Sequence, residues 1–396
     1  MLIGLVGKPS CGKSTFFKAC TLADVLIASY PFATIKPNHG IGYVKIDCID
    51  KDFGVQCQPR TGYCVNGIRF VPVELMDVAG LVEGASEGKG LGNQFLDDLR
   101  KADVFIHIVD VSGTTDDEGK ECEANSENPI KDVKMLEQEL DLWYNGILKK
   151  VWRTFARTVQ NTKEKFSEAV AKQFSGLKVK EEDVKQVLLK LKYNSEKPAE
   201  WTDEQLRNFS HELRHHTKKM IIAANKIDIP GSKDNLSKLK KEYPELLIVP
   251  CSADSELALR EASKAGLIDY LPGDKNFKLK GKINEKQKQA LEIIKKNVLD
   301  IYSSTGVQQV LNTSVFDLLK YIAVFPAGAH KLADSKGNIL PDCFLVPQGT
   351  TALDFAYHLH TDLGDNFIKA IDAKTKKPVG KEHKLKHRDG IEIITR

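Results

Sequence analysis

A phosphate-binding pattern stands close to the first residue of the chain. The apolar run 2–6 leads directly into Gly-Lys-Pro-Ser-Cys-Gly-Lys-Ser at residues 7–14, which has the spacing GxxxxGKS. Such a loop wraps a polyphosphate with backbone N–H groups, and the helix that follows points its positive end at the anion. We therefore expect a nucleotide site that includes nine residues of this segment: Gly7, Lys8, Pro9, Ser10, Cys11, Gly12, Lys13, Ser14 and Thr15.

The groups expected around the γ-phosphate predict hydrolysis assisted by Mg²⁺. Lys13 is expected to reach the β- and γ-phosphates, and Ser14 to offer its hydroxyl to the metal ion. The sequence Asp-Val-Ala-Gly at residues 77–80 matches DxxG, in which the aspartate holds Mg²⁺ and the glycine N–H meets the γ-phosphate. Asp77 is therefore a predicted metal ligand, and Gly80 joins Lys13 among the predicted catalytic residues.

A third pattern predicts which base is bound. Asn225, Lys226 and Asp228 form the sequence NKxD directly after an apolar run. A carboxylate at the last position accepts paired hydrogen bonds from guanine N1–H and the exocyclic amine, whereas adenine offers no such pair of donors. Asn225 would tie this loop to the phosphate loop, and the Lys226 stem would pack on the base face. Ser252 and Ala253 follow the next apolar run and would place backbone N–H groups near guanine O6, so the predicted cofactors are GTP and Mg²⁺.

The order GxxxxGKS, DxxG, NKxD and SA, each at the end of an apolar run, resembles a GTPase of the translation-factor class. Two further segments resemble the Obg family, in particular its YchF-like branch: Tyr-Pro-Phe-Ala-Thr at residues 30–34, and the glycine-rich stretch 80–96. The resemblance covers about residues 1–275. It implies that Thr34 is both a catalytic residue and a ligand of Mg²⁺, and that residues 84–92 are a switch loop whose order depends on the γ-phosphate.

Three positions refine what this resemblance implies. Leu81 stands where Ras-like enzymes place a glutamine that orients the attacking water, so we expect a slow intrinsic rate without a side-chain glutamine. Ser10 stands where many Obg relatives have an asparagine that is associated with potassium use, so the resemblance does not imply potassium activation here. Asp228 is kept, whereas the YchF members that are ATPases deviate from NKxD, and this favours GTP. The alternatives are an ATPase of the same fold, or a ribosome- or RNA-binding protein with a mainly structural nucleotide site.

The last part of the chain resembles a TGS domain, a ubiquitin-like β-grasp fold. The resemblance rests on residues 345–364, LVPQGTTALDFAYHLHTDLG, and covers about 322–396; it is as close to the DRG GTPases as to the YchF-like branch. Thr351 would cap a helix that carries Phe355 and Leu359. A TGS domain implies contact with RNA or the ribosome.

The elements that must position these residues follow from the apolar pattern. Short apolar runs at 2–6, 70–76, 104–109, 220–224 and 246–249 alternate with helical stretches, which predicts a parallel sheet covered on both faces. The gap between the third and fourth runs is far longer than a crossover helix needs. We expect a doubly wound α/β P-loop GTPase domain over 1–275 with a helical insertion at 128–216, a helical connector at 276–321 and the TGS domain at 322–396.

Composition narrows the class of protein further. At 396 residues the chain exceeds the usual size of one hydrophobic core. No stretch approaches the length of a membrane span, and the first residues resemble a strand rather than a signal peptide, so we expect a cytoplasmic protein without a membrane partner. The eight cysteines contain no CxxC pair, and their scattered spacing fits free thiols better than disulfides or a zinc site.

Positive charge is concentrated in three segments, although the net charge is only +4. Counting Lys and Arg against Asp and Glu, residues 149–197 carry +7, residues 275–296 carry +6 and residues 369–389 carry +5. Such segments predict a polyanionic partner, the ribosome or an RNA, which the insertion and the TGS domain would contact. The alternative is that they are solvated helix faces.

One pattern indicates different chemistry. Residues 211–215 are HELRH, which matches HExxH. On a helix this spacing presents two histidines to zinc, with the glutamate as general base of a metalloprotease. The segment is strongly charged and no third ligand is evident nearby in the sequence, so an exposed helix end is the favoured interpretation.

Overall fold

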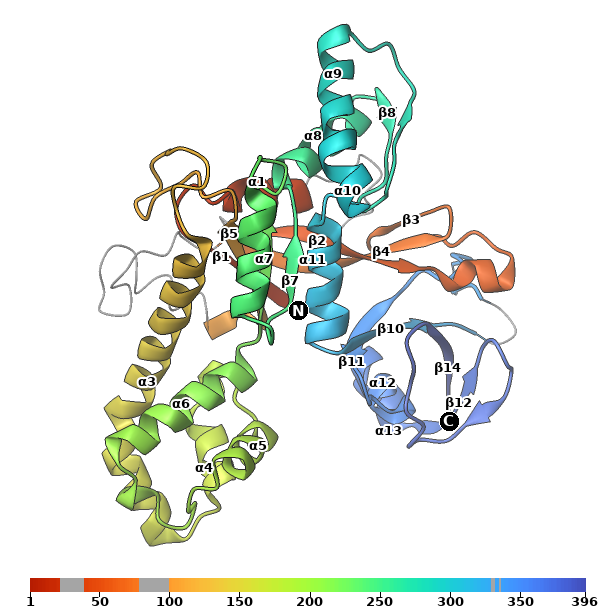
Figure 1. The fold of residues 1–396 in the computed structure, drawn as a ribbon. Coiled ribbons are helices and arrows are strands. Elements are labelled where there is room, and N and C mark those ends of the chain that lie inside the picture. Colours follow the sequence, from red (N-terminus) through yellow and green to blue (C-terminus); the bar gives the residue numbers. More distant parts are fainter. Residues whose placement is uncertain (22–38, 78–99, 329–331, 335) are drawn as a thin grey trace.

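The computed structural model describes residues 1–21, 39–77, 100–328, 332–334 and 336–396. Thr34, Gly80, Leu81 and the expected switch loop 84–92 lie outside these residues, so their roles stay predictions. Figure 1 shows a central α/β domain from which three parts project: a helical lobe, a smaller lobe with one long helix and a hairpin, and a C-terminal sheet domain drawn in blue.

A seven-stranded sheet forms the centre of the molecule. Its strands, in chain order, are β1 (Leu2–Val6), β2 (His39–Asp47), β3 (Tyr63–Val65), β4 (Ile68–Asp77), β5 (Val104–Asp110), β6 (Met220–Asn225) and β7 (Ile248–Pro250). Along the sheet the order is β2-β4-β1-β5-β6-β7, and β3 also pairs with β4. The five predicted apolar runs correspond to the parallel strands β4, β1, β5, β6 and β7.

Two strands that the apolar pattern did not predict make the sheet mixed. β2 and β3 both run antiparallel to β4, so the expectation of a purely parallel sheet was wrong at this edge. β3 and β4 are joined by Asn66 and Gly67, whose φ angles of 51° and 71° are both positive. Asn-Gly is the preferred sequence for such a two-residue turn, because its backbone matches the twist of the paired strands.

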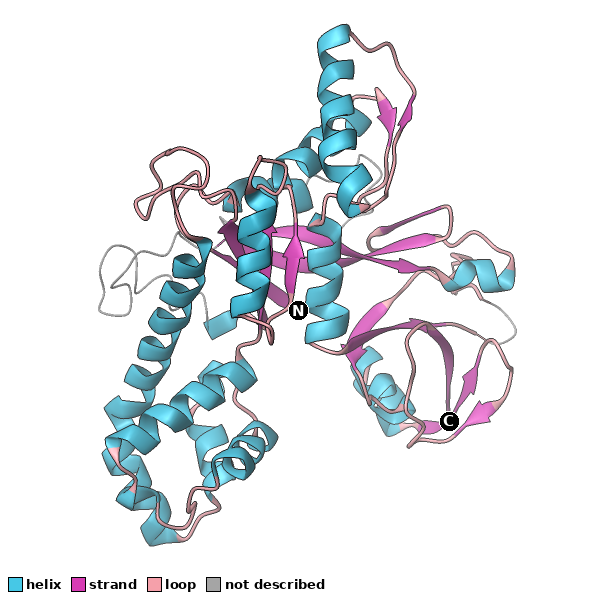
Figure 2. Cartoon of the chain, in the orientation of Figure 1, coloured by secondary structure: helices cyan, strands magenta, loops and turns pink. Residues whose placement is uncertain are grey.

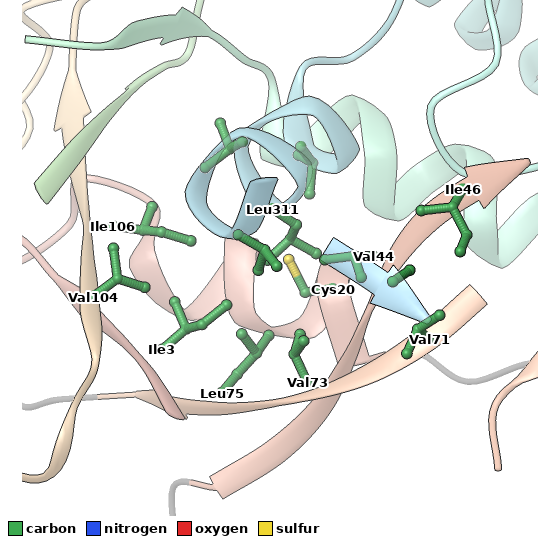
Figure 3. Close-up of a cluster of buried hydrophobic side chains, with 14 of the residues drawn as sticks. Ile3, Cys20, Val44, Ile46, Val71, Val73, Leu75, Val104, Ile106 and Leu311 are labelled. Atoms are coloured by element: carbon green, nitrogen blue, oxygen red, sulfur yellow. The ribbon is translucent and has the colours of Figure 1, made fainter. Parts of the chain in front are cut away.

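One face of the sheet is covered by α1 (Lys13–Thr21) and α11 (Val307–Asn312). Their apolar side chains pack against residues of β1, β2, β4 and β5 in one buried cluster. Figure 3 shows Cys20 of α1 and Leu311 of α11 together with Leu75 of β4 in this cluster. Because the sheet is buried on both faces, its central strands are almost continuously apolar.

The other face carries α3 (Pro129–Thr162) and α7 (Ser232–Glu242). α3 starts on the sheet and extends into the helical lobe, which is coloured yellow to green in Figure 1 and consists of helices joined by loops in Figure 2. The other helices of this lobe are α4 (Phe166–Gln173), α5 (Glu181–Leu191) and α6 (Asp203–Thr217). Aromatic rings fill its core, with centroid separations of 5.2 to 6.1 Å among Trp152, Phe166, Trp201 and Phe209.

The chain after β7 projects away from the sheet and then returns to it. This part comprises α8 (Ala253–Lys264), the strands β8 (Ile268–Asp269) and β9 (Lys278–Leu279), α9 (Glu285–Ile294), a π-helical turn η5 (Lys295–Leu299) and α10 (Asp300–Tyr302). We call residues 265–300 the α9 lobe. α11 and a second π-helical turn, η6 (Thr313–Leu318), then contribute buried side chains to the central core.

The C-terminal domain is a five-stranded sheet with two short helices. The strands lie in the order β11 (Phe344–Pro347), β10 (Tyr321–Pro326), β14 (Asp389–Thr395), β12 (Phe367–Asp372) and β13 (Pro378–Val379), and the helices are α12 (Ala352–Leu359) and α13 (Thr361–Asp365). Thr351 caps α12 as predicted, because its hydroxyl accepts from the N–H of Asp354 at 3.1 Å. Among the helices in the described ranges, none is both long and apolar enough to cross a membrane.

Candidate functional site

The phosphate loop lies between a buried strand and a helix N-terminus. β1 ends at Val6 and α1 begins at Lys13, so residues 7–12 form the connection. Gly12 has a φ of +95°, and a Cβ at this position would lie 2.2 Å from Nδ2 of Asn225. Glycine is therefore needed for both the backbone conformation and the close approach. The loop and the first residues of α1 line a cavity of about 420 Å³, in which backbone N–H groups at a helix N-terminus favour an anion.

Lys13 and Ser14 both contact the carboxylate at the end of β4. Nζ of Lys13 forms an ion pair with Asp77, and the Ser14 hydroxyl donates to Oδ2 of Asp77 at 3.4 Å. The parallel pairing of β1 with β4 places Leu5 opposite Asp77, so the ends of the two strands lie side by side. A hydroxyl and a carboxylate are the hard oxygen donors that Mg²⁺ prefers, and these residues therefore fit the predicted metal.

Asn225 joins the phosphate loop to the loop expected near the base. Its side chain is buried at the end of β6. Nδ2 donates to the carbonyl oxygen of Cys11 at 3.0 Å, and Oδ1 accepts from the N–H of Ala253 at 3.0 Å. One side chain thus fixes two loops that are far apart in the sequence.

A larger cavity of about 650 Å³ lies beside the phosphate loop. Its walls include many of the residues that the sequence predicts for nucleotide binding: Ser10, Gly12, Thr15, Asn225, Lys226, Asp228, Ser252 and Ala253. The hydroxyl of Ser252 caps α8 by accepting from the N–H of Ser255 at 3.3 Å.

One wall of this cavity was missed by the sequence analysis. The loop after β5 contributes Thr114, Thr115, Gly119 and Cys122 to the lining. The sequence did contain a signal for this wall: the largely polar run DVSGTTD, which begins at Asp110, directly follows the predicted strand 104–109. Polar residues at the carboxyl end of a parallel strand lie at the edge of the sheet where ligands bind.

Asp110 holds this loop and orients Lys226. Its buried carboxylate accepts hydrogen bonds from the hydroxyls of Thr114 at 3.0 Å and Thr115 at 2.8 Å, and it forms an ion pair with Nζ of Lys226 at 2.8 Å. Burial alone would raise the pKa of Asp110, but the hydrogen bonds, the one from Lys226 above all, lower the pKa overall. The Lys226 stem expected on the base face is therefore anchored at its charged end.

The side chains of Lys8 and Cys11 are engaged or buried within the protein, although both residues belong to the phosphate loop. Nζ of Lys8 donates to the carbonyl oxygen of Thr115 at 2.8 Å and lies 3.0 Å from Oδ2 of Asp132 on α3, and the lysine is buried. Because its ammonium group is bound by groups of the protein, we expect Lys8 to contact a phosphate through its backbone N–H. Burial raises the pKa of the Cys11 thiol to about 12, so this side chain stays neutral.

The HExxH histidines belong to an ion-pair cluster between α6 and α3. The rings of His211 and His215 lie 4.3 Å apart between centroids, and Asp141 of α3 approaches Nδ1 of His211 at 2.8 Å, so a third potential ligand does exist. Arg214 is buried among these groups, with Nε 2.9 Å from Asp141 and Nη2 2.7 Å from Nε2 of His215. This guanidinium disfavours a cation at the same position. Glu212 pairs with a lysine of α5 at 2.6 Å.

Three family models match the chain. Residues 2–138 match the model for a 50S ribosome-binding GTPase, residues 223–328 match the model for an Obg-like GTPase YGR210-like, G4 motif-containing domain, and residues 328–395 match the TGS domain. These matches and the observed sheet define the class of protein: it has a P-loop GTPase fold with a C-terminal TGS domain.

Full-length relatives identify the family. The chain is 48% identical over 395 residues to the uncharacterized GTP-binding protein MJ1332 of Methanocaldococcus jannaschii, covering 100% of this chain and 99% of the relative. It is 29% identical over 386 residues to the ribosome-binding ATPase YchF of Bacillus subtilis, covering 93% and 87%. The crystal structure of a GTP-binding protein from Pyrococcus horikoshii OT3 superposes with a TM-score of 0.81 at 39% identity, covering 100% of both chains. The chain belongs to a family of GTP-binding proteins that is similar to YchF and to Obg, which confirms the predicted family and fold class.

Proposed function

We propose that this protein binds GTP with Mg²⁺ and hydrolyses it slowly, as a switch that acts on the ribosome or on an RNA. The observation that carries the proposal is the meeting of three sequence patterns at one end of the sheet. Lys13 pairs with Asp77 at the phosphate end, and Asn225 bonds to the phosphate loop and to Ala253 at the base end. The two cavities share lining residues of the phosphate loop, so one extended ligand can occupy both.

The proposed hydrolysis depends on charge stabilisation by the chain. The Lys13 ammonium and the backbone N–H groups of the phosphate loop would hold the β- and γ-phosphates, and the N–H of Gly80 would meet the γ-phosphate. Ser14, Asp77 and Thr34 would hold Mg²⁺, which supplies neutralisation of the phosphate oxygens. Because Leu81 stands where Ras-like enzymes place the glutamine that orients the attacking water, the intrinsic rate is expected to be slow.

Guanine is the base that we propose for the larger cavity. Asp228 lies in a turn that two hydrogen bonds support, from the N–H of Ile227 to the carbonyl oxygen of Cys251 at 3.2 Å and from the Ser232 hydroxyl to the carbonyl oxygen of Lys226 at 2.9 Å. A carboxylate held in this way can accept the paired guanine donors. The Bacillus subtilis relative is named an ATPase, which makes ATP the competing candidate.

A competition experiment distinguishes the two bases. GTP and ATP would each displace a fluorescent GDP analogue from the full chain in the presence of Mg²⁺. We expect GTP to displace it at concentrations at least about tenfold lower, which corresponds to roughly 1.4 kcal/mol. Equal displacement by the two nucleotides would contradict guanine selectivity and favour the ATPase.

The α9 lobe and the TGS domain are the surfaces that we propose for the polyanionic partner. Seven lysines of the insertion form ion pairs: Lys131, Lys149, Lys165, Lys178, Lys185, Lys190 and Lys197. Within the described part of the chain, by contrast, no ion pair involves the eight exposed lysines of the α9 lobe: Lys275, Lys278, Lys280, Lys282, Lys286, Lys288, Lys295 and Lys296. Their charge is available to phosphate groups, so the basic insertion contributes less than the sequence alone suggests.

Co-sedimentation with ribosomes tests this surface. The double variant K286E and K288E reverses two charges on α9, and K238E and K240E on α7 provide a control with the same change in net charge. We expect the α9 variant to weaken binding more than the control, and binding of the unaltered chain to fall steeply with salt, because phosphate contacts release counterions. Equal binding by both variants would exclude the α9 lobe as the contact.

A further inference from the structure

Three cysteines and an aspartate that are separate in the sequence meet beside the β3–β4 hairpin. Cys48 precedes the short helix η1 (Ile49–Phe53), which contains Asp50, and Cys64 lies on β3. Cys57 lies in the loop between these elements. One potential ligand atom from each of the four residues lies within 4.8 Å of those of the other three. None of the eight cysteines is in a disulfide in the structure, and these three lie close together in space.

Two of the separations within the cluster are close to those between ligands of one tetrahedral ion. Sγ of Cys48 lies 3.6 Å from Sγ of Cys57, and Sγ of Cys64 lies 3.6 Å from Oδ2 of Asp50. Bond lengths of about 2.3 Å to sulfur and about 2.0 Å to oxygen give tetrahedral edges of about 3.8 Å between two sulfurs and about 3.5 Å between sulfur and oxygen. These two of the six separations thus lie within a few tenths of an ångström of zinc geometry, and the other four are at most 4.8 Å.

Burial makes this cluster costly without a cation. Asp50 is 1% exposed, and its Oδ1 has no hydrogen-bond partner among the described residues. Cys48 and Cys57 are also buried. A carboxylate in such a place is destabilised unless it is paired or coordinates a metal. A divalent ion at this point would supply the missing charge.

Arg69 supports a cluster of anionic ligands. Its guanidinium is fully buried, and Nη1 lies 3.5 Å from Sγ of Cys57. Four anionic ligands would exceed the charge of one divalent ion by two, and Arg69 offsets one of these charges. Second-shell groups of this kind orient ligands and tune a metal site.

The cluster also lies where the central domain meets the segment that leads into β11. Arg69 donates to the carbonyl oxygens of Leu340 at 3.2 Å and Pro341 at 2.9 Å. The backbone N–H of Gln58 donates to Ile339 at 2.8 Å. An ion that fixes Cys57 would therefore also fix the loop that holds this segment of the C-terminal half.

We propose that Cys48, Cys57, Cys64 and Asp50 bind a structural Zn²⁺ ion that fastens the hairpin of the central domain to the segment before β11. Soft thiolate ligands favour zinc over the hard cations that suit the nucleotide site. A site closed by four protein ligands is structural, because no position is open for water or a substrate.

Metal analysis of the full chain tests the site directly. The chain is purified without a metal-affinity tag and supplied with Zn²⁺, and we expect about one zinc per chain after dialysis. Replacement by Co²⁺ should give the visible bands of tetrahedral cobalt together with thiolate-to-cobalt charge transfer. Removal of Zn²⁺ by a chelator should lower the melting temperature, because metal binding contributes to folding.

Three variants distinguish coordination from simple burial. The triple variant C48S, C57S and C64S should lose zinc, and Asp50→Asn, which keeps the side-chain shape, should weaken Zn²⁺ binding by about tenfold or more. Cys343→Ser, a change at a buried thiol outside the cluster, should retain zinc. If the triple variant fails to fold, Asp50→Asn and the cobalt spectrum of the unaltered chain still decide. The absence of zinc uptake, equal uptake by the triple variant, or a disulfide between Cys48 and Cys57 in the fresh protein would each overturn the proposal.

Discussion

Replacing Asn225 by alanine tests whether one side chain holds the nucleotide pocket together. The change removes both the hydrogen bond to the Cys11 carbonyl and the bond from the Ala253 N–H, each 3.0 Å long. It also leaves a void next to Gly12, whose missing Cβ would lie 2.2 Å from Nδ2 of Asn225. The two backbone groups that lose their partner lie in different walls of the site.

The expected loss follows from the burial of these two groups. Asn225 is 2% exposed, so water replaces its hydrogen bonds poorly. A buried donor or acceptor left without a partner costs about 1–3 kcal/mol, and two such groups therefore cost about 2–6 kcal/mol. Bound GTP would have to reorder both loops. We expect its affinity to fall by at least about 2 kcal/mol, or roughly thirtyfold.

The assay is titration of a fluorescent GTP analogue together with a thermal unfolding curve. Asn312→Ala is the matched control, because Asn312 also bonds to both backbone groups of one distant residue, donating to the carbonyl oxygen of Lys45 at 2.7 Å and accepting from its N–H at 2.9 Å. The control should lower stability without changing GTP affinity. If Asn225→Ala binds GTP within about threefold of the unaltered chain, less than roughly 0.7 kcal/mol, the reasoning is refuted.

Three further outcomes are expected. Asp228→Asn should weaken GTP by more than ~2 kcal/mol and admit a xanthine nucleotide, which a nucleotide competition series would measure; unchanged GTP affinity would remove Asp228 from the base site. Lys13→Ala should abolish measurable turnover while Leu81→Ala stays within about tenfold of the unaltered rate; a thousandfold loss on Leu81→Ala would mean that the apolar side chain organises the site. Burial lowers the pKa of His107, a residue of β5, from 6.5 to about 3. Between these two pH values the unfolded chain therefore takes up a proton at this histidine, whereas the folded chain does not. The free energy of unfolding should therefore fall by about 2 kcal/mol more between pH 7 and pH 5 than in His107→Leu, and equal pH slopes in denaturant titrations would contradict this.

The local sequence was sufficient to predict a feature wherever the residues that form it are neighbours in the chain. The phosphate loop, DxxG and NKxD each place their functional groups within a few residues, and the apolar runs place them at strand ends. Parallel strands then bring those ends to one edge of the sheet without further information. The family, the fold class and the cap at Thr351 could be predicted from the sequence for the same reason.

Tertiary structure alone decided which partners the polar side chains find. Lys8 follows the phosphate-loop pattern, yet its ammonium group lies against Asp132 because α3 crosses this face of the sheet. The wall that Thr114 and Thr115 provide depends on hydrogen bonds to a buried carboxylate at the end of β5. The cluster around Asp50 arises only when a hairpin and a short helix fold together. The Lys8–Asp132 pair depends on packing between distant segments, and the other two depend on how a short stretch of chain turns back on itself. Residue spacing alone encodes neither.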